Sequence, residues 1–314
     1  MPVRVLITGA SGYLGGWLSD SLTKRTSVEV IHGVRHHLPP DSTAQYVPFD
    51  LGDTSTYDRA LDGIDVLVNL AGMSQDECTR SPSECMRLNA VNPAILLGYA
   101  KNHKVKRVLH VSTIQVLGQP LPRDIRGPMP VSPANVYAQA HAEAEVRLGE
   151  PADLRVDIVR LANGFGFPRN AARCWHLAIN DFCRQAVTTG EIRLTSSGRQ
   201  QRNFVSTRAI AGFLAHLVNS PTTSGCGKEI WTFGSPRSQT VLSAAHQVAK
   251  RWTHQSGRKT TVLPLDQVEP EQAESFLDLS PIEMLGFNLD CLTPDAHLLM
   301  IDDTLQHCRN SFLS

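Results

Sequence analysis

Two side chains that can exchange protons, Tyr137 and His141, are four residues apart. In a helix this spacing places both on one face, one turn apart. A tyrosine has a reference pKa of about 10 and a histidine one of about 6.5, so the phenol needs help to ionise near neutral pH, and the imidazole is charged only when protonated. The two side chains are chemically able to transfer a proton, but on spacing alone an ordinary pair on a helix surface is the better interpretation, and a catalytic role depends on the motifs around the pair.

The amino-terminal segment 3–15 has the pattern of a short buried strand that turns directly into a helix through three glycines. Gly9 permits a tight turn, Gly12 lets the backbone approach a pyrophosphate, and Gly15 lets the helix pack against the strand. The amino end of that helix would then face the anion. The segment therefore predicts a dinucleotide-binding loop.

Composition narrows the class of partner. Thirty basic and thirty acidic residues cancel, and no charged run indicates a nucleic-acid or membrane surface, so we expect a small-molecule ligand. The seven cysteines form no CxxC pair, which favours reduced thiols and no metal site. No segment has membrane-spanning length, so we expect a cytoplasmic protein.

Apolar runs alternate with helical patterns along the first half of the chain, which predicts an α/β fold with a doubly wound parallel Rossmann sheet. Residues 1–163, with a returning segment near 204–235, would form the dinucleotide-binding domain, and residues 164–314 mainly a smaller α/β substrate-binding lobe. A proline-rich loop at 119–133 would border the active site. The expected strands are 28–34, 46–49, 65–71, 107–112, 155–161, 192–197, 204–206, 229–233 and 260–265, and the expected helices are 82–102, 135–148 and one beginning at Thr293 and Pro294.

The end of the second expected strand, where a carboxylate would bind the ribose hydroxyls of NAD, has the sequence Gly33-Val34-Arg35. A guanidinium offers a permanently charged, bidentate partner for a 2′-phosphate. Arg35 therefore favours NADP(H), with NAD(H) as the other option. The alternative is a solvated loop arginine beside His36 and His37.

Further motifs follow the glycine loop in a fixed order: Phe49-Asp50-Leu51, Asn69-Leu-Ala-Gly72, Asn89, Val111-Ser-Thr-Ile-Gln-Val-Leu-Gly118, Tyr137, Arg160-Leu-Ala-Asn163 and Gly198-Arg-Gln-Gln-Arg-Asn-Phe-Val205. This order resembles the extended short-chain dehydrogenases/reductases, in particular their NAD(P)-dependent nucleotide-sugar epimerase, dehydratase and reductase branch. The resemblance covers nearly the whole chain, except that the family's YxxxK motif is YxxxH here.

The resemblance implies roles for individual residues. Thr113, with Ser112 as a substitute, would hydrogen-bond the substrate oxygen, Tyr137 would exchange the proton as a hydride moves, and His141 would anchor the nicotinamide ribose in place of lysine. A nucleotide-sugar would bind Ser112, Thr113, Asn163, Asn180 and Arg202. The cofactor would bind Gly9, Ser11, Gly12, Tyr13, Leu14, Gly15, Arg35, Asp50, Leu51, Leu70, Ala71, Gly72, Asn89, Val111, Tyr137, His141 and Leu161, although Asp50 could equally be a turn residue.

The implied reaction is reduction of a keto group on a nucleotide-diphosphate sugar, of the 4-ketoreductase type. Ile114 and Gln115 replace the Asp-Glu pair of the family's dehydratases, and neither can act as an acid or base, which disfavours dehydration. One alternative is an NAD-dependent nucleotide-sugar epimerase, and another is a cofactor-binding homologue without turnover. Helices 82–102 and 135–148 resemble those of the family's dimer interface, so we expect a homodimer.

Overall fold

The computed structural model describes residues 2–24, 27–35, 45–127, 129–149, 153–169, 174–220, 225–267, 270 and 272–313. His36 and His37, the neighbours of Arg35 in the sequence, lie outside the described residues. The chain divides into two compact units. The first comprises residues 1–119, 128–161 and 211–232, and the second comprises residues 120–127, 162–210 and 233–314.

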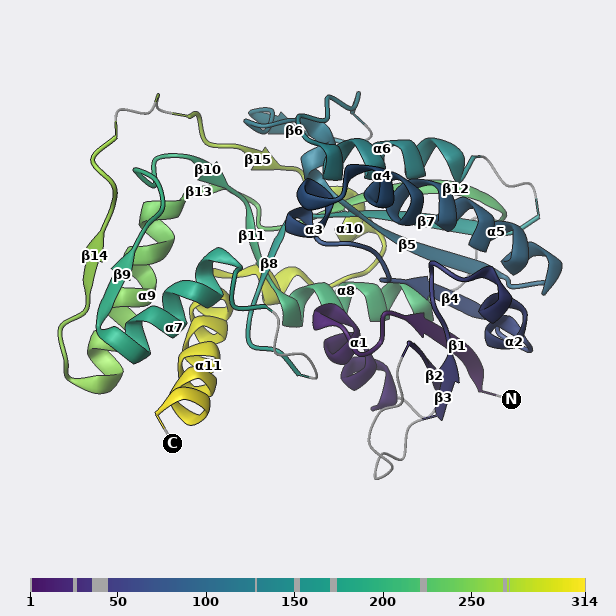
Figure 1. The fold of residues 1–314 in the computed structure, drawn as a ribbon, viewed down its shortest axis with the longest axis horizontal. Helices are drawn as coiled ribbons and strands as arrows, with labels where there is room; N and C mark the ends of the chain where they lie inside the picture. Colours follow the sequence, from purple (N-terminus) through teal and green to yellow (C-terminus); the bar gives the residue numbers. More distant parts are fainter. Residues whose placement is uncertain are drawn as a thin grey trace. The chain divides into compact units, whose positions relative to one another are not determined.

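The first unit contains a seven-stranded sheet with the order β12-β7-β5-β4-β1-β2-β3 (Figure 1). All strand pairs from β3 to β7 are parallel, which confirms the predicted doubly wound Rossmann fold. The strands are β1 (Val3–Thr8), β2 (Val28–Val34), β3 (Gln45–Pro48), β4 (Val66–Asn69), β5 (Arg107–Thr113), β7 (Arg155–Leu161) and β12 (Gly227–Phe233).

The strand order reverses between β1 and β4. In open parallel sheets, ligands bind at the carboxyl ends of the strands at such a switch point. Thr8 and Asn69 are the last residues of these two strands and are paired in register. The topology therefore places the glycine loop and the Asn69–Gly72 motif at the same end of the sheet.

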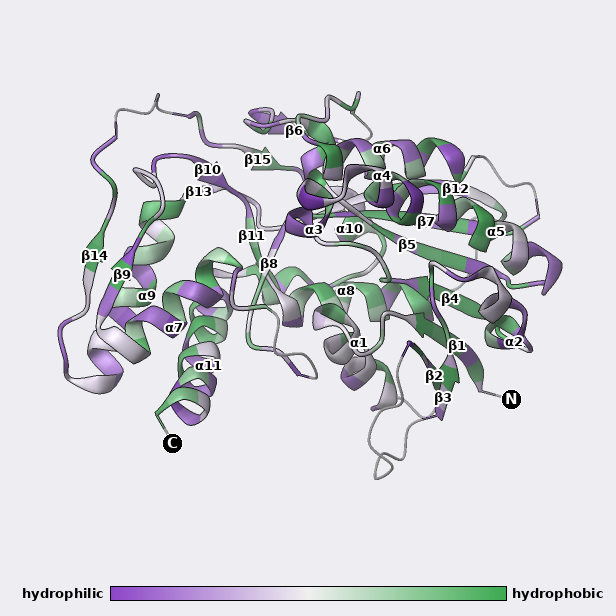
Figure 2. Ribbon diagram, viewed as in Figure 1, coloured by the Kyte–Doolittle hydropathy of each residue, from purple (hydrophilic) through white to green (hydrophobic). Residues whose placement is uncertain are grey.

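Burial explains why these segments form strands. Every residue of β4 and β7 is buried, as parallel strands covered on both faces require, and Figure 2 shows the central strands as predominantly apolar. The helices of this unit are α1 (Tyr13–Thr23), α2 (Tyr57–Leu61), α3 (Gln75–Arg80), α4 (Pro82–Cys85), α5 (Asn92–Asn102) and α6 (Val136–Arg147), together with the greater part of α8 (Thr207–Asn219).

The expected single helix at 82–102 is wrong in one respect, because a π-helical segment, η2 (Met86–Val91), separates α4 from α5. Pro93 lies in the first turn of α5, where its missing N–H removes a donor from the regular ladder of helical hydrogen bonds. Wider turns of this kind accommodate such interruptions and are frequent near functional sites. Here η2 carries Asn89.

The second unit combines helices with four short strand pairs. β8 (Asn163–Phe165) pairs with β11 (Phe204–Ser206), β9 (Glu191–Arg193) with β14 (Thr261–Leu263), β10 (Gln201–Arg202) with β13 (Gln239–Thr240), and β6 (Asp124–Ile125) with β15 (Phe276–Leu277). The observed strands at 191–193 and 261–263 are shorter than expected. The helices are α7 (Ala178–Thr189), α9 (Val241–Ser256), α10 (Ser280–Met284) and α11 (Pro294–Phe312), and α11 begins as predicted, with the Thr293 side chain accepting a hydrogen bond from the Ala296 N–H.

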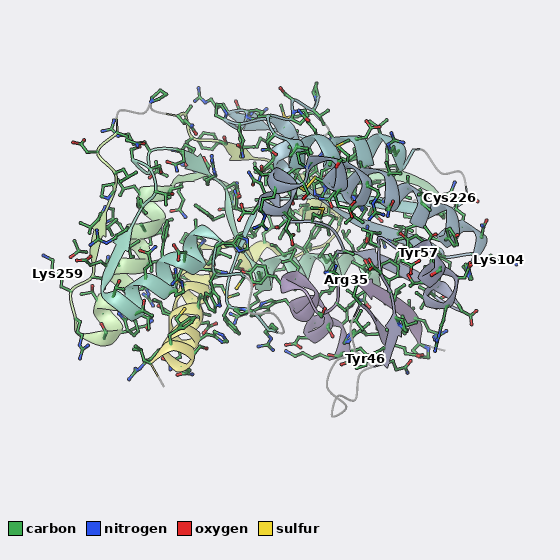
Figure 3. The ribbon with its side chains drawn as sticks, in the orientation of Figure 1. Arg35, Tyr46, Tyr57, Lys104, Cys226 and Lys259 are labelled. Carbon is green, nitrogen blue, oxygen red and sulfur yellow. A yellow bond between two sulfur atoms is a disulfide. The ribbon has the colours of Figure 1, made fainter. Side chains whose placement is uncertain are left out.

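The expectation that every cysteine is a reduced thiol is wrong for Cys78 and Cys85, which form a disulfide (Figure 3). The two residues lie on consecutive short helices, α3 and α4, and the turn at Ser81 brings their Cα atoms to 4.8 Å, a separation typical of disulfides. A sequence spacing of seven does not reveal this approach, because it depends on where the two helices end. The remaining five cysteines are free.

Within the described ranges, no helix is long and apolar enough to cross a membrane. The same residues contain no cluster of three or more histidine, cysteine, aspartate or glutamate side chains that could hold a metal ion.

Candidate active site

The glycine loop has the geometry that a pyrophosphate requires. Gly9 has a φ of +67°, and the Gly12 N–H donates to the Gly9 carbonyl at 2.8 Å. A Cβ at Gly12 would lie 2.9 Å from Gly9 O, and one at Gly15 would lie 2.4 Å from the same atom. The N-cap of α1 has no side-chain hydrogen bond and its first turn has no acidic residue, so this helix end is compatible with a bound anion. Ser11, Tyr13 and Leu14 are half-buried beside the loop.

Asn89 supports the backbone that follows β4, the segment expected to line the cofactor. Its Oδ1 accepts from the Met73 N–H at 2.7 Å, and its Nδ2 donates to the Met73 carbonyl at 2.9 Å. A Cβ at Gly72 would lie 3.0 Å from Asn89 Oδ1. The buried amide thus fixes the turn that follows Leu70 and Ala71, and these two residues are themselves half-buried.

The other residues expected to bind the cofactor differ in their exposure to solvent. Arg35, labelled in Figure 3, directly follows β2 and is exposed, whereas Leu51 and Leu161 are buried and Val111 is half-buried. Asp50 forms a turn, because its Oδ1 accepts from the Gly52 N–H at 2.8 Å. This hydrogen bond supports the turn interpretation of Asp50 over direct contact with adenine.

The two candidate hydroxyls at the end of β5 differ in their partners. Ser112 Oγ donates to Glu145 Oε1 at 2.6 Å, so its proton is already engaged. Thr113 Oγ1 accepts from the Gln115 N–H at 3.2 Å, an interaction that leaves the hydroxyl proton available to a ligand. The geometry therefore favours Thr113 over Ser112 as the group that orients a substrate oxygen.

Tyr137 lies in the first turn of α6, which begins where the Asn135 side chain accepts from the Ala138 N–H at 2.9 Å. Its side chain is half-buried, and within the part of the chain that the structure describes its hydroxyl makes no hydrogen bond. Loss of solvation raises the pKa of Tyr137 to about 12. The phenol is therefore protonated at neutral pH, and its hydroxyl is not held by the described residues.

His141 packs against Tyr137 with ring centroids 4.5 Å apart and planes inclined by 69°. The imidazole is 8% exposed, and burial, together with the neighbouring His110, lowers the pKa of His141 to about 3. The expected one-turn pairing is confirmed, but the imidazole is neutral. It can donate or accept a hydrogen bond, and it does not supply the positive charge that a lysine would.

An ion pair fixes α6 against the sheet one turn after His141. Glu145 accepts from Arg160 Nε at 3.1 Å and from Arg160 Nη2 at 2.7 Å, and both side chains are almost fully buried. The same carboxylate binds Ser112. Glu145 therefore links α6 to β5 and β7 beside Thr113.

Two of the three expected substrate residues in the second unit share one cavity. Asn163 and Arg202 line a pocket of about 330 Å³ that also includes His176, Asp181 and Gln200. Burial lowers the pKa of Arg202 from its ordinary value, and this guanidinium remains a cation at neutral pH because arginine ionises so high. The pocket thus combines an amide with a partly desolvated positive charge.

Asn180, the third expected substrate residue of the second unit, binds backbone groups of the protein. It is 0% exposed, its Oδ1 accepts from the Gly166 N–H at 2.8 Å, and its Nδ2 donates to the Cys174 carbonyl at 3.2 Å. Both ends of the amide therefore bind backbone. The geometry supports a role for Asn180 in holding the segment before α7.

Sequence reasoning missed His110 and Gln200. His110 lies in β5 and its Nε2 is buried without a partner, as is Gln200 Oε1, among the described residues. The signal for His110 was a histidine flanked on both sides by apolar residues of the strand. Gln200 offered none, because the sequence places it among several polar residues.

Comparison with known proteins identifies the family. The family model described as "NAD dependent epimerase/dehydratase family" matches residues 5–231. The chain belongs to this family. Epimerase/dehydratase proteins include enzymes of several reaction types, so membership establishes an NAD-dependent enzyme family without fixing the reaction.

Two curated relatives illustrate this variety of reaction types. The chain is 26% identical over 184 residues to a probable UDP-arabinose 4-epimerase 3 of Arabidopsis thaliana, covering 52% of this chain and 44% of that protein. It is 30% identical over 210 residues to a 4-hydroxy-2-methyl-3-oxo-4-farnesyl-3,4-dihydroquinoline-1-oxide ketoreductase of Stigmatella aurantiaca, covering 63% and 59%. The chain spans about half the length of the curated relatives that it matches.

A solved structure extends the similarity in fold to the whole chain. The crystal structure of UDP-glucose 4-epimerase from Bifidobacterium longum, in complex with NAD+ and UDP, aligns with a TM-score of 0.80 over 99% of this chain and 100% of that chain, at 19% identity. At this identity the match concerns the fold alone.

Proposed function

We propose that this chain is an NAD(P)-dependent oxidoreductase that reduces a keto group of a nucleotide-diphosphate sugar. The observation that carries the proposal is the protonated, unbonded Tyr137 phenol beside a neutral His141. A general acid must begin the reaction in its protonated form, and a phenol with a raised pKa meets this condition at neutral pH.

The same observation separates reduction from epimerisation. An epimerase must first oxidise its substrate, and this step needs a phenolate to accept the hydroxyl proton. A nearby cation would stabilise such a phenolate, but His141 is neutral and burial disfavours the charged form of Tyr137. Reduction also leaves a phenolate, which must then be reprotonated, but it starts from the protonated phenol that predominates at neutral pH, whereas oxidation starts from the phenolate; the resting protonation state of Tyr137 therefore favours reduction.

Each residue then has a defined role. A reduced nicotinamide cofactor, when bound, supplies the hydride. Thr113 donates a hydrogen bond that orients the substrate carbonyl, Tyr137 donates the proton to its oxygen, and His141 hydrogen-bonds the cofactor ribose. The loop from Gly9 to Gly15 holds the pyrophosphate through backbone N–H groups, and its tight path leaves no room for a Cβ at Gly12 or Gly15, which would collide with the Gly9 carbonyl oxygen.

A nucleotide-sugar is supported by the second unit and by the relatives. Arg202 and Asn163 line one pocket, and a guanidinium suits phosphate oxygens. Curated relatives include enzymes named for UDP-arabinose and UDP-glucose. The ketoreductase relative is named for a farnesylated quinoline, so carbonyl reduction and the identity of the substrate require separate tests.

The proposed cofactor preference is for NADP(H), because Arg35 is exposed at the end of β2 and can approach a 2′-phosphate. The family description names NAD, and NAD(H) is the other option. We also propose a homodimer, which light scattering on the purified chain will test.

The decisive experiment combines cofactor binding with turnover. The protein is denatured to identify any bound nucleotide, and the apoprotein is then titrated with NADPH and NADH. The proposal expects exchangeable binding, a preference for NADPH, and loss of that preference in Arg35→Asp. Tightly retained NAD would instead support the epimerase.

Turnover is measured with keto-sugar nucleotides in wild type, Tyr137→Phe and Tyr99→Phe. Loss of the acid should slow reduction by about 10²- to 10⁴-fold while NADPH still binds. Tyr99, which packs edge-on against Tyr57 in the core, provides the matched control and should keep its turnover. Undiminished reduction by Tyr137→Phe would overturn the mechanism, and a protein that binds the cofactor without any turnover would be a non-catalytic homologue.

A further inference from the structure

A line of hydrogen-bonding side chains crosses the sheet of the first unit from the cofactor segment toward His141. The Ala71 N–H donates to Thr8 Oγ1 at 3.3 Å, and Thr8 Oγ1 donates to Asn69 Oδ1 at 2.6 Å. Asn69 Nδ2 lies 3.2 Å from His110 Nδ1. These residues come from neighbouring strands β1, β4 and β5, so the line runs across the sheet.

The direction of each hydrogen bond along this line is determined by chemistry. Asn69 accepts at Oδ1 from Thr8, so the atom beside His110 is the amide nitrogen, which can only donate. His110 Nδ1 must then accept. A neutral imidazole that accepts at Nδ1 carries its proton on Nε2, and burial keeps His110 neutral, lowering its pKa to about 4. His110 Nε2–H is therefore a hydrogen-bond donor.

The rings of His110 and His141 are neighbours, and each has one nitrogen without a hydrogen-bond partner among the described residues. Among the described residues, His110 Nε2 and His141 Nδ1 are buried and have no hydrogen-bond partner. The two ring centroids lie 6.3 Å apart. Buried polar groups in native proteins are nearly always paired, and this donor and acceptor can be paired through one internal water, or directly once the two rings move closer together.

We propose that His110 is a positioning residue for His141: its Nε2–H hydrogen-bonds His141 Nδ1, directly or through one water, and so fixes the tautomer in which His141 carries its proton on Nε2. His141 Nε2–H is then the donor presented to the ligand side of the ring. The function of that donor, hydrogen bonding to the cofactor ribose, rests on the proposed function, whereas the link between the two histidines does not.

The first test detects the link without any ligand. Long-range ¹H–¹⁵N correlation spectra of the full chain with ¹⁵N-labelled histidine show which nitrogen of each neutral imidazole carries the proton. Wild-type protein should show His110 and His141 as Nε2–H tautomers, with His141 Nδ1 as a hydrogen-bonded acceptor. In His110→Phe, which keeps an aromatic ring, the His141 Nδ1 resonance should move to the position of an unbonded nitrogen.

A matched control is His32→Phe, because His32 is also a buried histidine of this sheet but its Nε2 is paired with Ser19 Oγ at 2.8 Å. This change should leave the His141 resonances in place. A His141 Nδ1 resonance unchanged by His110→Phe would overturn the proposal, and so would an Nδ1–H tautomer of His141 in the wild type.

The second test asks whether His110 acts through His141. The dissociation constant of NADPH is measured for His110→Phe, His141→Phe and the double variant. Each single change should weaken binding by about three- to tenfold, as expected for a lost hydrogen bond, and the double variant should bind no more weakly than His141→Phe. Multiplicative effects would indicate an independent structural role for His110 and would overturn the proposal. If no variant, including wild type, bound nucleotide, the proposed function would fail, while the spectra would still decide the link.

Discussion

The imidazole of His141 packs edge-to-face against the phenol of Tyr137, with ring centroids 4.5 Å apart. Neither group is charged at neutral pH, because burial raises the pKa of Tyr137 to about 12 and lowers that of His141 to about 3. The pair differs from a tyrosine beside a lysine, in which the cation would stabilise the phenolate. The pH dependence of the site follows from this difference.

The first prediction is that carbonyl reduction by the wild type shows no step near the ordinary histidine pKa of about 6.5. The active form of a general acid is protonated, so its activity is lost as pH rises through its pKa. In His141→Lys the added cation should lower the pKa of Tyr137, which moves this loss to lower pH. Initial rates measured against pH will show the shift. Ultraviolet titration of the tyrosines will show it without substrate, when the titration curve of the Tyr137→Phe variant is subtracted to isolate the signal of Tyr137.

His103→Lys is the control for the pH experiment, because His103 pairs with Asp58 at 2.9 Å on the surface. It should leave both the rate profile and the tyrosine titration unchanged. A step near pH 6.5 in the wild type would show that His141 titrates as an ordinary histidine, contrary to its burial.

The second prediction concerns the ion pair between Glu145 and Arg160. Glu145→Gln keeps the shape of the side chain but leaves the buried Arg160 cation without a counter-charge, and removal of one partner of a buried pair costs about 3 kcal/mol or more. We expect the free energy of unfolding, measured with urea, to fall by that amount. The control is Glu143→Gln, because Glu143 forms an exposed ion pair with Arg147 on the same helix. This change should lower the free energy of unfolding by less than about 1 kcal/mol. Equal costs would contradict the structural role of Glu145.

The third prediction concerns the space at Gly15. A methyl group there would lie 2.4 Å from Gly9 O and 2.6 Å from Ala10 O, so Gly15→Ala must displace the backbone that would hold the pyrophosphate. We expect at least tenfold weaker NADPH binding, which corresponds to about 1.4 kcal/mol. Gly98→Ala provides the control, because no atom lies within 4 Å of its added Cβ. In the middle of α5, that change should preserve binding and stabilise the helix by about 0.5 kcal/mol or more.

The sequence was sufficient to predict the sheet and the pairing of Tyr137 with His141, because both depend on local periodicity. Segments rich in Val, Ile and Leu identified β5 and β7, and a spacing of four placed the two rings together. The electrostatic state of the pair was not predictable, since the pKa of His141 depends on desolvation and on His110, which packing brings beside it.

The partners of individual polar groups could not be predicted for the same reason. Ser112 and Thr113 are adjacent and chemically similar, and only the packing of Glu145, 33 residues later on α6, against the end of β5 shows that Ser112 is engaged. Asn180 was expected to contact substrate because its place in the sequence matches a family position. Its amide binds Gly166 and Cys174, contacts that depend on the path of the preceding segment.

The fourth prediction concerns the Cys78–Cys85 disulfide, which the sequence did not indicate. Its sulfurs lie between two parts of the candidate site: Asn89 Nδ2 is 3.6 Å from Cys78 Sγ, and Cys85 Sγ is 3.9 Å from the carbonyl oxygen of Val136, the residue before Tyr137. Protein denatured without reductant and alkylated should therefore carry five modified cysteines, the number left free, and seven after reduction. Seven modified cysteines without reduction would contradict the disulfide.

The disulfide should also support the start of α6. Removing the cross-link relaxes a constraint on the unfolded chain, so the double variant Cys78→Ser/Cys85→Ser should lose about 2 kcal/mol of unfolding free energy. Cys226→Ser, at an exposed free cysteine, is the control and should be neutral. Because both sulfurs are buried against segments that carry Asn89 and Tyr137, the double variant should bind NADPH more weakly than this control. Equal affinity would show that the cross-link stabilises α3 and α4 without influencing the site.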